Sequence, residues 1–455
     1  MGPVDFSGIY FHGEALFDGA KFHDTATFDR AKFEDHADFD NAHFLGPVSF
    51  DQAVFEDHAG FQDARFSTKA SFAQAEFRAY ADFERTCFEE DASLREATFQ
   101  LARRLGPIKA RKTLVLNGCV FNERLLIEIE AETFSAQAAF FADGVRLSVR
   151  RAAVFLNEAD FGRASTLSSP ADPLTDANSI EKDAQGGCQA RLITIRGAQV
   201  ARLSLSDLDL HACRFFGAHG LESLIVEPSC EWPRTPLGLR VDREVIAEEH
   251  HWRCERDSRI PKWRLGRRQW AAHATDPCDW PDSRSRGEPL HPEDLATLYR
   301  ALRKAREDNK DQAGAGDLYY GEMEMRRVTP RPNGRGKIRA LCDRAIITSY
   351  WLLSGYGLKA SRAFFAWLCV IAAAGFGLYK WGIVPSQSHP QATALGLPQA
   401  MLFSLENTSS LIRLAHLPDD YELRLSGEII QVVIRLVGPL LIGLWLLALR
   451  ARVKR

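Results

Sequence analysis

The chain has 455 residues, 45% hydrophobic and 26% charged, which allows two or three folded domains and excludes a disordered polypeptide. The net charge of −3 is unevenly spread: residues 1–99 hold 20 acidic and 8 basic residues, which leaves 40 acidic and 49 basic residues for the remainder. Nine cysteines without CxxC spacing, an odd number, argue against a complete disulfide framework and favour a reducing compartment.

The beginning of the chain carries no targeting signal that we recognise. Its first residues, MGPVDFSGIYFHG, lack the basic region followed by an apolar run that defines a secretory signal peptide. We therefore expect roughly the first 340 residues to stay in the cytosol, where thiols remain reduced.

A repeat occupies the first hundred residues, in which phenylalanines are spaced alternately by five and six and usually follow an alanine two positions earlier. On an α-helix this pattern would scatter the apolar residues over several directions, whereas on a strand residues i−2 and i point to the same side. Strands this short bury their apolar side only by stacking, so we predict a β-solenoid. Its predicted core residues are Phe17, Phe22, Phe28, Phe33, Phe39, Phe44, Phe50, Phe55, Phe61, Phe66, Phe72, Phe77, Phe83 and Phe88.

These A-x-F units at five-residue spacing resemble the pentapeptide-repeat family. The resemblance implies a mainly β fold, a right-handed quadrilateral β-solenoid with four units per coil, here 22 residues. We assign residues 1–100 to this regular solenoid. Short alternating runs such as Thr113–Phe121 and Ala201–Phe215 predict a degenerate solenoid continuation over 101–228, after a break at Arg103–Arg111 and with an inserted loop at Ser168–Gly187.

The middle of the chain changes character. Residues 229–290, with several tryptophans and no clear period, are predicted to be a connector or cap. Residues 291–345 are predicted to form a helical hairpin and linker, because PEDLATLYRALRKARED and DLYYGEMEMRR show helical spacing. The strings LYRALRKAREDN, GDLYYGEMEMRR, YWLLSGYGLKASRA and GPLLIGLWLLALRARVKR resemble a membrane-anchored subgroup of pentapeptide-repeat proteins. That subgroup has no assigned biochemical activity.

Residues 346–455 are predicted to be a membrane domain. Ala363–Val384 and Ile429–Leu449 are long and apolar enough to be transmembrane helices, with 385–428 as the external loop; the alternative is a buried core hairpin. Basic residues flank the two spans and are scarce in the loop, so the positive-inside rule places both termini in the cytosol of a cell-membrane protein. The flanking residues are Arg335, Lys337, Arg339, Arg344, Lys359, Arg362, Arg450, Arg452, Lys454 and Arg455, against Arg413 and Arg424 in the loop.

Within the loop, Pro398–Arg413 is an apolar stretch that is too short to span a bilayer. One interpretation is a re-entrant pore element with Glu406, Asn407, Thr408 and Ser409 near the permeation path. The other is an amphipathic segment lying on the outer leaflet. The sequence Gly355-Tyr356-Gly357 precedes the first span, and we predict a turn there and not an ion filter.

No Walker loop, nucleophile elbow, HExxH or dinucleotide-binding fingerprint is present, so we expect neither an enzyme nor a cofactor or metal site. We expect a scaffold or sensor in which the solenoid binds an unknown protein ligand and the tail enters the lipid bilayer, with a channel and a homo-oligomer as variants. Direct binding of nucleic acid is not expected. The alternative is an acidic DNA-mimic inhibitor of a DNA-binding enzyme, which the net −12 of residues 1–99 suggests.

Overall fold

The computed structural model describes residues 2–170, 189–235, 242–258, 290–329, 337–385, 396–408 and 421–453. The chain forms two units, Met1–Leu318 and Tyr319–Arg455, each considered by itself below.

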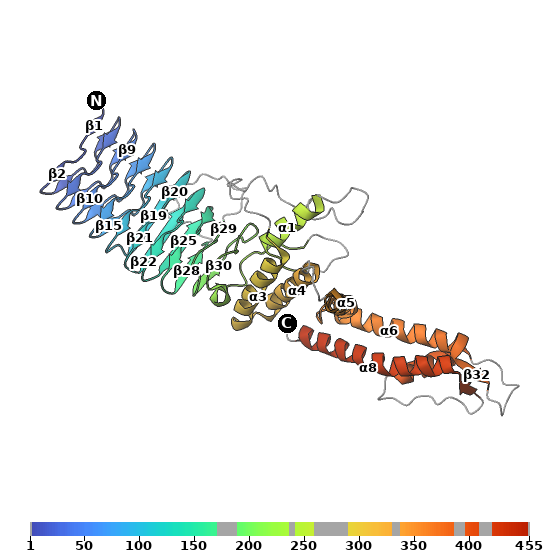
Figure 1. Ribbon diagram of the computed structural model, residues 1–455. Coiled ribbons are helices and arrows are strands. Elements are labelled where there is room, and N and C mark those ends of the chain that lie inside the picture. Colours follow the sequence, from blue (N-terminus) through green and yellow to red (C-terminus); the bar gives the residue numbers. More distant parts are fainter. Residues whose placement is uncertain are drawn as a thin grey trace. The chain divides into compact units, whose positions relative to one another are not determined.

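The first unit is a β-solenoid, drawn from blue to green in Figure 1, in which parallel strands stack coil upon coil. Four sheets, named A to D here, run along it. Sheet A contains β1 (Val4–Asp5), β5 (Ala26–Thr27), β9 (Val48–Ser49), β13 (Ala70–Ser71), β17 (Ala92–Ser93), β20 (Thr113–Val115), β23 (Thr133–Ser135), β26 (Ala153–Phe155) and β29 (Arg191–Thr194). One strand of sheet A belongs to each coil, so the solenoid has about nine turns.

The other three sheets form the remaining sides of the coils. Sheet B contains β2 (Tyr10–Phe11), β6 (Lys32–Phe33), β10 (Val54–Phe55), β14 (Glu76–Phe77), β18 (Thr98–Phe99), β21 (Val120–Phe121), β24 (Phe140–Phe141) and β27 (Asp160–Phe161). Sheet C contains β3 (Ala15–Leu16), β7 (Ala37–Asp38), β11 (Ala59–Gly60) and β15 (Ala81–Asp82). Sheet D contains β4 (Lys21–Phe22), β8 (His43–Phe44), β12 (Arg65–Phe66), β16 (Cys87–Phe88), β19 (Arg104–Ala110), β22 (Leu125–Glu130), β25 (Val145–Arg150), β28 (Ser165–Ser168), β30 (Leu203–Ser206) and β31 (Ile225–Val226).

In the first four coils each residue pairs with the one 22 positions later, as in Phe33↔Phe55 and Phe55↔Phe77. The phenylalanine rings therefore stack in columns, with centroids 4.8 Å apart for Phe33 and Phe55. The predicted core phenylalanines from Phe28 to Phe88 are 0 or 1% exposed, Phe22 is 9% exposed, and Phe17, in the first coil, is half-buried. The alternation of alanine and phenylalanine suits this core, because a small and a large side chain share each unit.

Coil-to-coil hydrogen bonds at the corners support these columns. Asp51 Oδ1 accepts the Ala73 N–H, at 2.9 Å, and the hydroxyl of Ser71 from the next coil. Asp29 makes the same pair of contacts with Ser49 and the Asp51 N–H. Backbone donors that a sharp corner would leave unpaired are satisfied in this way.

The solenoid changes its cross-section after the fourth coil. Sheet C ends at β15, while sheet D strands lengthen from two residues to six or seven at β19, β22 and β25. The register falls to 20 residues, as in Thr113↔Thr133. The predicted four-sided coil therefore describes residues 4–88, and the continuation has three sheets, because one longer strand replaces two short strands and their corner. The β-solenoid itself is confirmed, and its right-handedness stays a prediction.

The core changes together with the cross-section. In β22 the residues alternate strictly between buried and half-buried positions, and Leu125, Ile127 and Ile129 point inward. Sheet B keeps its aromatic column, through Phe99, Phe121, Phe141 and Phe161. Aliphatic side chains make up most of the rest of the buried core in this section.

Helices follow the last coil. The short helix η1 (Leu221–Ser223) lies within the last coil, before β31. The first unit ends with α1 (Ala247–Ser258), α3 (Pro292–Asp308) and the start of α4 (Gln312–Val328), which runs across the boundary between the units. The predicted helical hairpin corresponds to α3 and α4. Of the tryptophans in the predicted connector, Trp232 is buried, and Trp263, Trp270 and Trp280 lie outside the described residues.

The second unit is helical. It contains α5 (Lys337–Ser354), α6 (Ala360–Gly377), the π-helical turn η4 (Leu378–Gly382), β32 (Ile383–Pro385), α7 (Leu397–Thr408), β33 (Tyr421–Leu423) and α8 (Leu425–Val453). Helices α6 and α8 run side by side (Figure 1), and β32 pairs antiparallel with β33 at one end of them. Segments Ala360–Gly382 and Leu425–Arg450 are long and apolar enough to cross a membrane.

These two helices do not resemble core helices of a soluble domain. Only 28% of the apolar stretch of the first and 22% of that of the second is buried by the rest of the chain. Leu436, Leu440 and Leu447 of α8 are all more than 60% exposed. The structure therefore gives no support to the buried hairpin that the sequence left open.

Candidate binding surface and candidate pore residues

The outward side chains of the solenoid segregate by charge. Sheet C presents acidic residues, because Asp38 and Asp82 lie on its strands and Asp18, Asp40 and Glu84 follow them. Sheet D presents Lys21, His43, Arg65, Cys87 and Lys109 at corresponding positions of successive coils, so that all but Cys87 are basic residue types. The net charge of the repeat section thus hides an acidic side and a basic side.

The acidic patch is centred on Gly60, between Asp38 and Asp82 in register on sheet C. A side chain at Gly60 would bring its Cβ within 2.7 Å of Asp40 Oδ1, so the missing side chain leaves room for that carboxylate. Burial raises the pKa of Asp40, the Gln62 N–H offsets part of this, and the charges of Asp38 and Asp82 add to the increase. Among the described residues, no basic side chain forms an ion pair with Asp38, Asp40 or Asp82.

Sheet B differs because its charges neutralise one another across coils. Glu56 forms ion pairs with Lys32 at 3.1 Å and with Arg78 at 2.9 Å. Arg78 also forms an ion pair with Glu76 at 2.8 Å. Such exposed pairs contribute little to stability, but they leave little uncompensated charge for a partner. Of these three sheets, C and D therefore present more unpaired charge than B.

A column of stacked rings borders the acidic patch at the corner before sheet C. His36 stacks on His58 with centroids 4.8 Å apart, and His58 stacks on Tyr80 at 5.3 Å. The Nδ1 atoms of the two histidines lie 3.1 Å apart. Flat rings beside carboxylates suit a partner that carries guanidinium groups.

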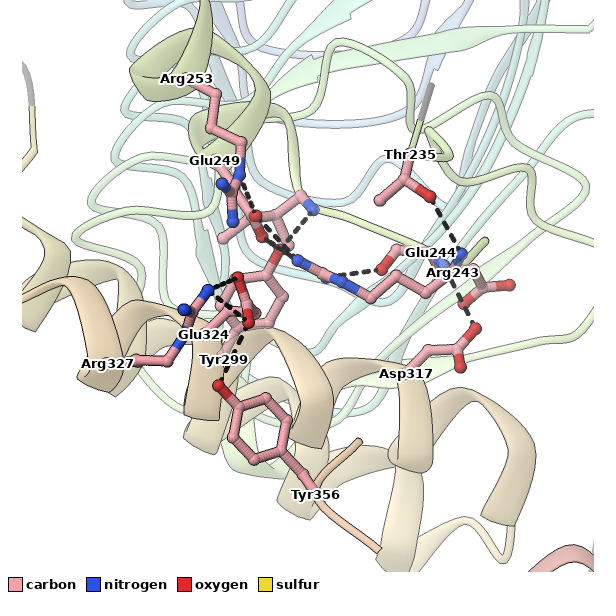
Figure 2. Close-up of polar contacts among 11 residues, drawn as sticks. Thr235, Arg243, Glu244, Glu249, Arg253, Tyr299, Asp317, Glu324, Arg327 and Tyr356 are labelled. Carbon is pink, nitrogen blue, oxygen red and sulfur yellow. Dashed lines mark hydrogen bonds and ion pairs between the residues drawn. The ribbon is translucent and has the colours of Figure 1, made fainter. Parts of the chain in front are cut away.

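A buried ionic cluster lies beyond the last coil (Figure 2). Arg243 donates to both carboxylate oxygens of Glu249 at 2.7 Å, and the Arg253 Nε donates to Glu249 at 2.6 Å. The Tyr299 hydroxyl of α3 also donates to Glu249 and accepts the Ile246 N–H at 3.2 Å. Burial alone would raise the pKa of Glu249, but Arg243 and Arg253 more than compensate and lower it to about 2.

A second set of contacts joins this cluster to the solenoid core. Trp232 stacks on Phe215 with centroids 5.5 Å apart, and the Arg306 guanidinium lies 4.8 Å from the centre of the Trp232 ring. Arg306 also pairs with Glu244 at 3.0 Å and with Asp311. These contacts join α1 and α3 to the end of the solenoid and cover its apolar interior. Both oxygens of Glu249 are occupied, so we assign this cluster a structural role.

The second unit has its own polar junction, before α6 (Figure 2). Gly355, Tyr356 and Gly357 all have positive φ and form the predicted turn. The buried Tyr356 donates its hydroxyl proton to Glu324 at 3.1 Å, and Arg327 donates to both oxygens of Glu324, also at 3.1 Å. These contacts hold the turn against the C-terminal half of α4.

The predicted pore residues lie on or after α7, which packs against α6 and α8. Asn407 is buried, and its Oδ1 accepts hydrogen bonds from Gln431 Nε2 and Arg435 Nε of α8, both at 3.0 Å. Thr408 is also buried, Glu406 is half-buried, and Ser409 lies outside the described residues. Asn407 thus provides a polar partner for the arginine in the middle of α8.

Close backbone approach holds α7 against α8. A Cβ at Gly438 would lie 2.3 Å from the carbonyl oxygen of Thr408, so only glycine permits this contact. Within one chain, Asn407 and Thr408 serve this packing. A pore lined by residues 406–409 stays a prediction.

Comparison with known proteins bears on the repeat section. A family model described as pentapeptide repeats, in nine copies, matches residues 6–53 and 50–98. The N-terminal section consists of pentapeptide repeats. The match covers the Phe-rich coils, and the three-sheet continuation of the solenoid lies outside it.

The search of curated proteins and the search of solved structures found no match for this chain. The assignment to the membrane-anchored subgroup therefore stays a prediction from the four sequence strings.

The ionic cluster around Glu249 was not predicted from the sequence, because Arg243 and Tyr299 lie 56 residues apart and belong to no motif. The only signal was Tyr299, which lies on the apolar side of the predicted helix. The acidic patch could have been found by assigning residues to sides of the coil, since Asp38 and Asp82 are two coils apart at the same position.

Proposed function

We propose that the protein is a membrane-tethered pentapeptide-repeat scaffold whose solenoid binds a basic protein partner in the cytosol. The observation that carries this proposal is the difference in apolar burial between the solenoid and helices α6 and α8. The solenoid buries its apolar side chains and exposes charge, while α6 and α8 leave most of their apolar surface uncovered. Lipid is the solvent in which such uncovered leucines are stable.

The orientation in the membrane follows from the basic residues. They cluster before α6 and at the end of α8, and only Lys380, Arg413 and Arg424 lie between the two helices. By the positive-inside rule the solenoid and the C-terminus face the cytosol.

The acidic patch of sheet C is the proposed docking site. Its carboxylates at Asp38, Asp40 and Asp82 lack basic partners among the described residues, whereas those of sheet B are paired. A basic partner would relieve the mutual repulsion of these carboxylates and would be attracted to them at a distance. Stacked His36, His58 and Tyr80 offer flat surfaces beside the charge.

The same charge layout argues against a DNA-mimic inhibitor. A mimic of duplex DNA presents negative charge along its length. Here sheet D presents Lys21, Arg65 and Lys109 in a column along the same solenoid.

Site-specific photo-crosslinking in intact cells tests the docking site. Leu16 and Tyr10 both lie in the first coil and are 64% and 61% exposed, but Leu16 lies on sheet C beside Asp38 and Tyr10 on sheet B. A photoreactive residue at position 16 should give a discrete adduct, whereas one at position 10 should not.

The matched variant replaces the three patch aspartates by asparagines, Asp38→Asn, Asp40→Asn and Asp82→Asn, because asparagine keeps the side-chain oxygen that accepts the local backbone N–H groups. The adduct at position 16 should disappear while the protein stays in the membrane fraction. Equal adducts from both positions, or an adduct that survives the triple variant, would contradict the proposed docking site.

A further inference from the structure

Helix α5 exposes an apolar side that none of the residues described in the structure covers. Leu341, Ile346 and Leu352 are 69%, 66% and 65% exposed. On a helix these residues share one broad side with Ala345, and Cys342 lies between them and is also exposed. Three large apolar side chains exposed on one short helix indicate an interaction surface.

The opposite side of α5 is packed within the second unit. The Trp351 Nε1–H donates to the Tyr320 hydroxyl at 2.9 Å, and the guanidinium groups of Arg327 and Arg362 lie 4.5 and 5.6 Å from the centre of the Trp351 ring. Tyr350 contacts the buried Tyr356 of the turn. The helix is therefore held in one orientation, with its apolar side turned outward.

The basic residues of α5 and its place just before α6 indicate what covers its apolar side. The sequence of α5 contains three basic residues and one acidic residue, and Arg344 is exposed next to the apolar side. The helix ends five residues before α6, the first helix that is apolar enough to cross a membrane. Figure 1 shows α5 nearly end-on while α6 and α8 run lengthwise, so α5 does not continue the line of α6.

We infer that α5 is an interfacial helix that binds the anionic phospholipids of the cytosolic leaflet. Its apolar side enters the boundary of the acyl chains, and its basic residues meet phosphate headgroups. The inference rests on the proposed membrane attachment through α6 and α8. It adds a second contact with the lipid, one that depends on lipid charge and fixes the turn at Tyr356 at the membrane surface.

The native cysteines provide the test. Full-length protein is reconstituted into vesicles of phosphatidylcholine alone or with increasing phosphatidylglycerol, and a water-soluble thiol reagent is added to both sides. Mass spectrometry of the peptides then gives a separate rate for Cys342 in α5, Cys369 in α6 and Cys87 in the solenoid. Cys369 reports insertion of the span, Cys342 reports burial of α5, and Cys87 corrects for reagent activity.

We expect Cys369 to be protected in all vesicles and Cys342 to become less reactive as phosphatidylglycerol increases. The variant Leu341→Glu with Ile346→Glu should restore the reactivity of Cys342, whereas Leu16→Glu on the solenoid should not. Arg344→Gln should reduce the protection of Cys342 that phosphatidylglycerol causes. The equilibrium constant for membrane binding of α5 should fall by about fivefold, the effect of one basic residue near an anionic surface.

The two proposals fail differently. If Cys369 is protected but Cys342 reacts at one rate in the native protein and the double variant, in every lipid mixture, α5 is not interfacial although the tether stands. Protection of Cys342 that follows protein density and not lipid charge would assign this side to a second copy of the chain and overturn the inference. If Cys369 itself reacts freely, the proposed membrane tether fails.

Discussion

The solenoid buries its apolar side chains, whereas the helices α5 to α8 leave many of theirs exposed. In the solenoid each coil covers the next, so Phe50 and its neighbours are fully buried and the outside is polar. In the helical unit the apolar residues of α6 and α8 are mostly uncovered. The difference teaches that one sequence can combine a region that covers its apolar side chains by repetition with a region that leaves apolar side chains exposed.

The two regions also differ in how they place polar groups. The solenoid repeats the same corner contact in successive coils, as Asp29 and Asp51 show. The helical unit uses single contacts, such as Asn407 with Arg435 and Tyr356 with Glu324. A substitution in the core of the solenoid should therefore destabilise neighbouring coils as well. A substitution in the helical unit should disturb only the contacts at its own position.

The largest effect is expected from Phe50→Asp. This change removes a fully buried ring and introduces an unpaired charge between coils. Removal of a buried Phe side chain alone costs about 3–5 kcal/mol, and the charge adds to it. Circular dichroism should show loss of the cooperative β transition. The exposed neighbour change Gln52→Asn should leave the transition in place, and a native-like melt for Phe50→Asp would refute the stacked core.

Arg243→Met should have the next largest effect. It leaves Glu249 buried without its bidentate partner, a loss of about 3–5 kcal/mol for a broken buried pair. The control is Arg234→Met, since Arg234 pairs with Asp242 on the surface, where about 0–1 kcal/mol is expected. Denaturant unfolding of both variants measures the difference. Equal midpoints for the two would show that the cluster does not hold the end of the solenoid.

The same cluster should make stability depend on acid. Burial raises the pKa of Glu249, but its arginine partners lower the folded value to about 2, below the unfolded value. The stabilising contribution is therefore complete above the unfolded pKa, about 4.3, and is lost as the pH falls towards 2. Melting temperatures measured between pH 6 and pH 2.5 should fall more steeply for the native protein than for Glu249→Gln. Parallel curves would show that Glu249 is not ionised in the folded state.

The regular repeat allowed the strands of the solenoid to be predicted from the sequence. Phenylalanine and alanine at fixed offsets are compatible with stacked strands and not with one helical stripe, and the structure has those strands. The loss of sheet C was not readable in the same way. Leu125-Leu-Ile-Glu-Ile-Glu130 alternates as any half-buried strand does, and this alternation does not state how many sides a coil has.

The helical contacts were less predictable. Asn407 meets Gln431 and Arg435 across 24 and 28 residues, a distance over which spacing carries no information. Helix α5 was missed because its exposed apolar residues at 341, 346 and 352 are five and six apart and show no regular helical stripe. Its basic residues were used only to predict orientation.

A smaller and local effect is expected from Gly438→Leu. The new side chain would collide with the backbone of Thr408 and push α7 from α8, at a cost of about 1–3 kcal/mol. Gly443→Leu is the matched control on the same helix, because nothing lies within 4 Å of its Cβ position. Unfolding in detergent micelles titrated with dodecyl sulfate should separate the two variants, while the β transition of the solenoid stays unchanged in both. A similar loss for Gly443→Leu would show that the helix contact is not specific.

The central claim is that a cytosolic solenoid is tethered by α6 and α8, and cysteine labelling in intact cells tests it most directly. Leu397→Cys lies between the two helices and Arg65→Cys lies on sheet D, and both positions are exposed. In a background without reactive native thiols, a membrane-impermeant reagent should label position 397 from outside, and position 65 only after the membrane is opened. Labelling of position 65 in intact cells, or equal labelling of both positions before and after opening, would contradict the account.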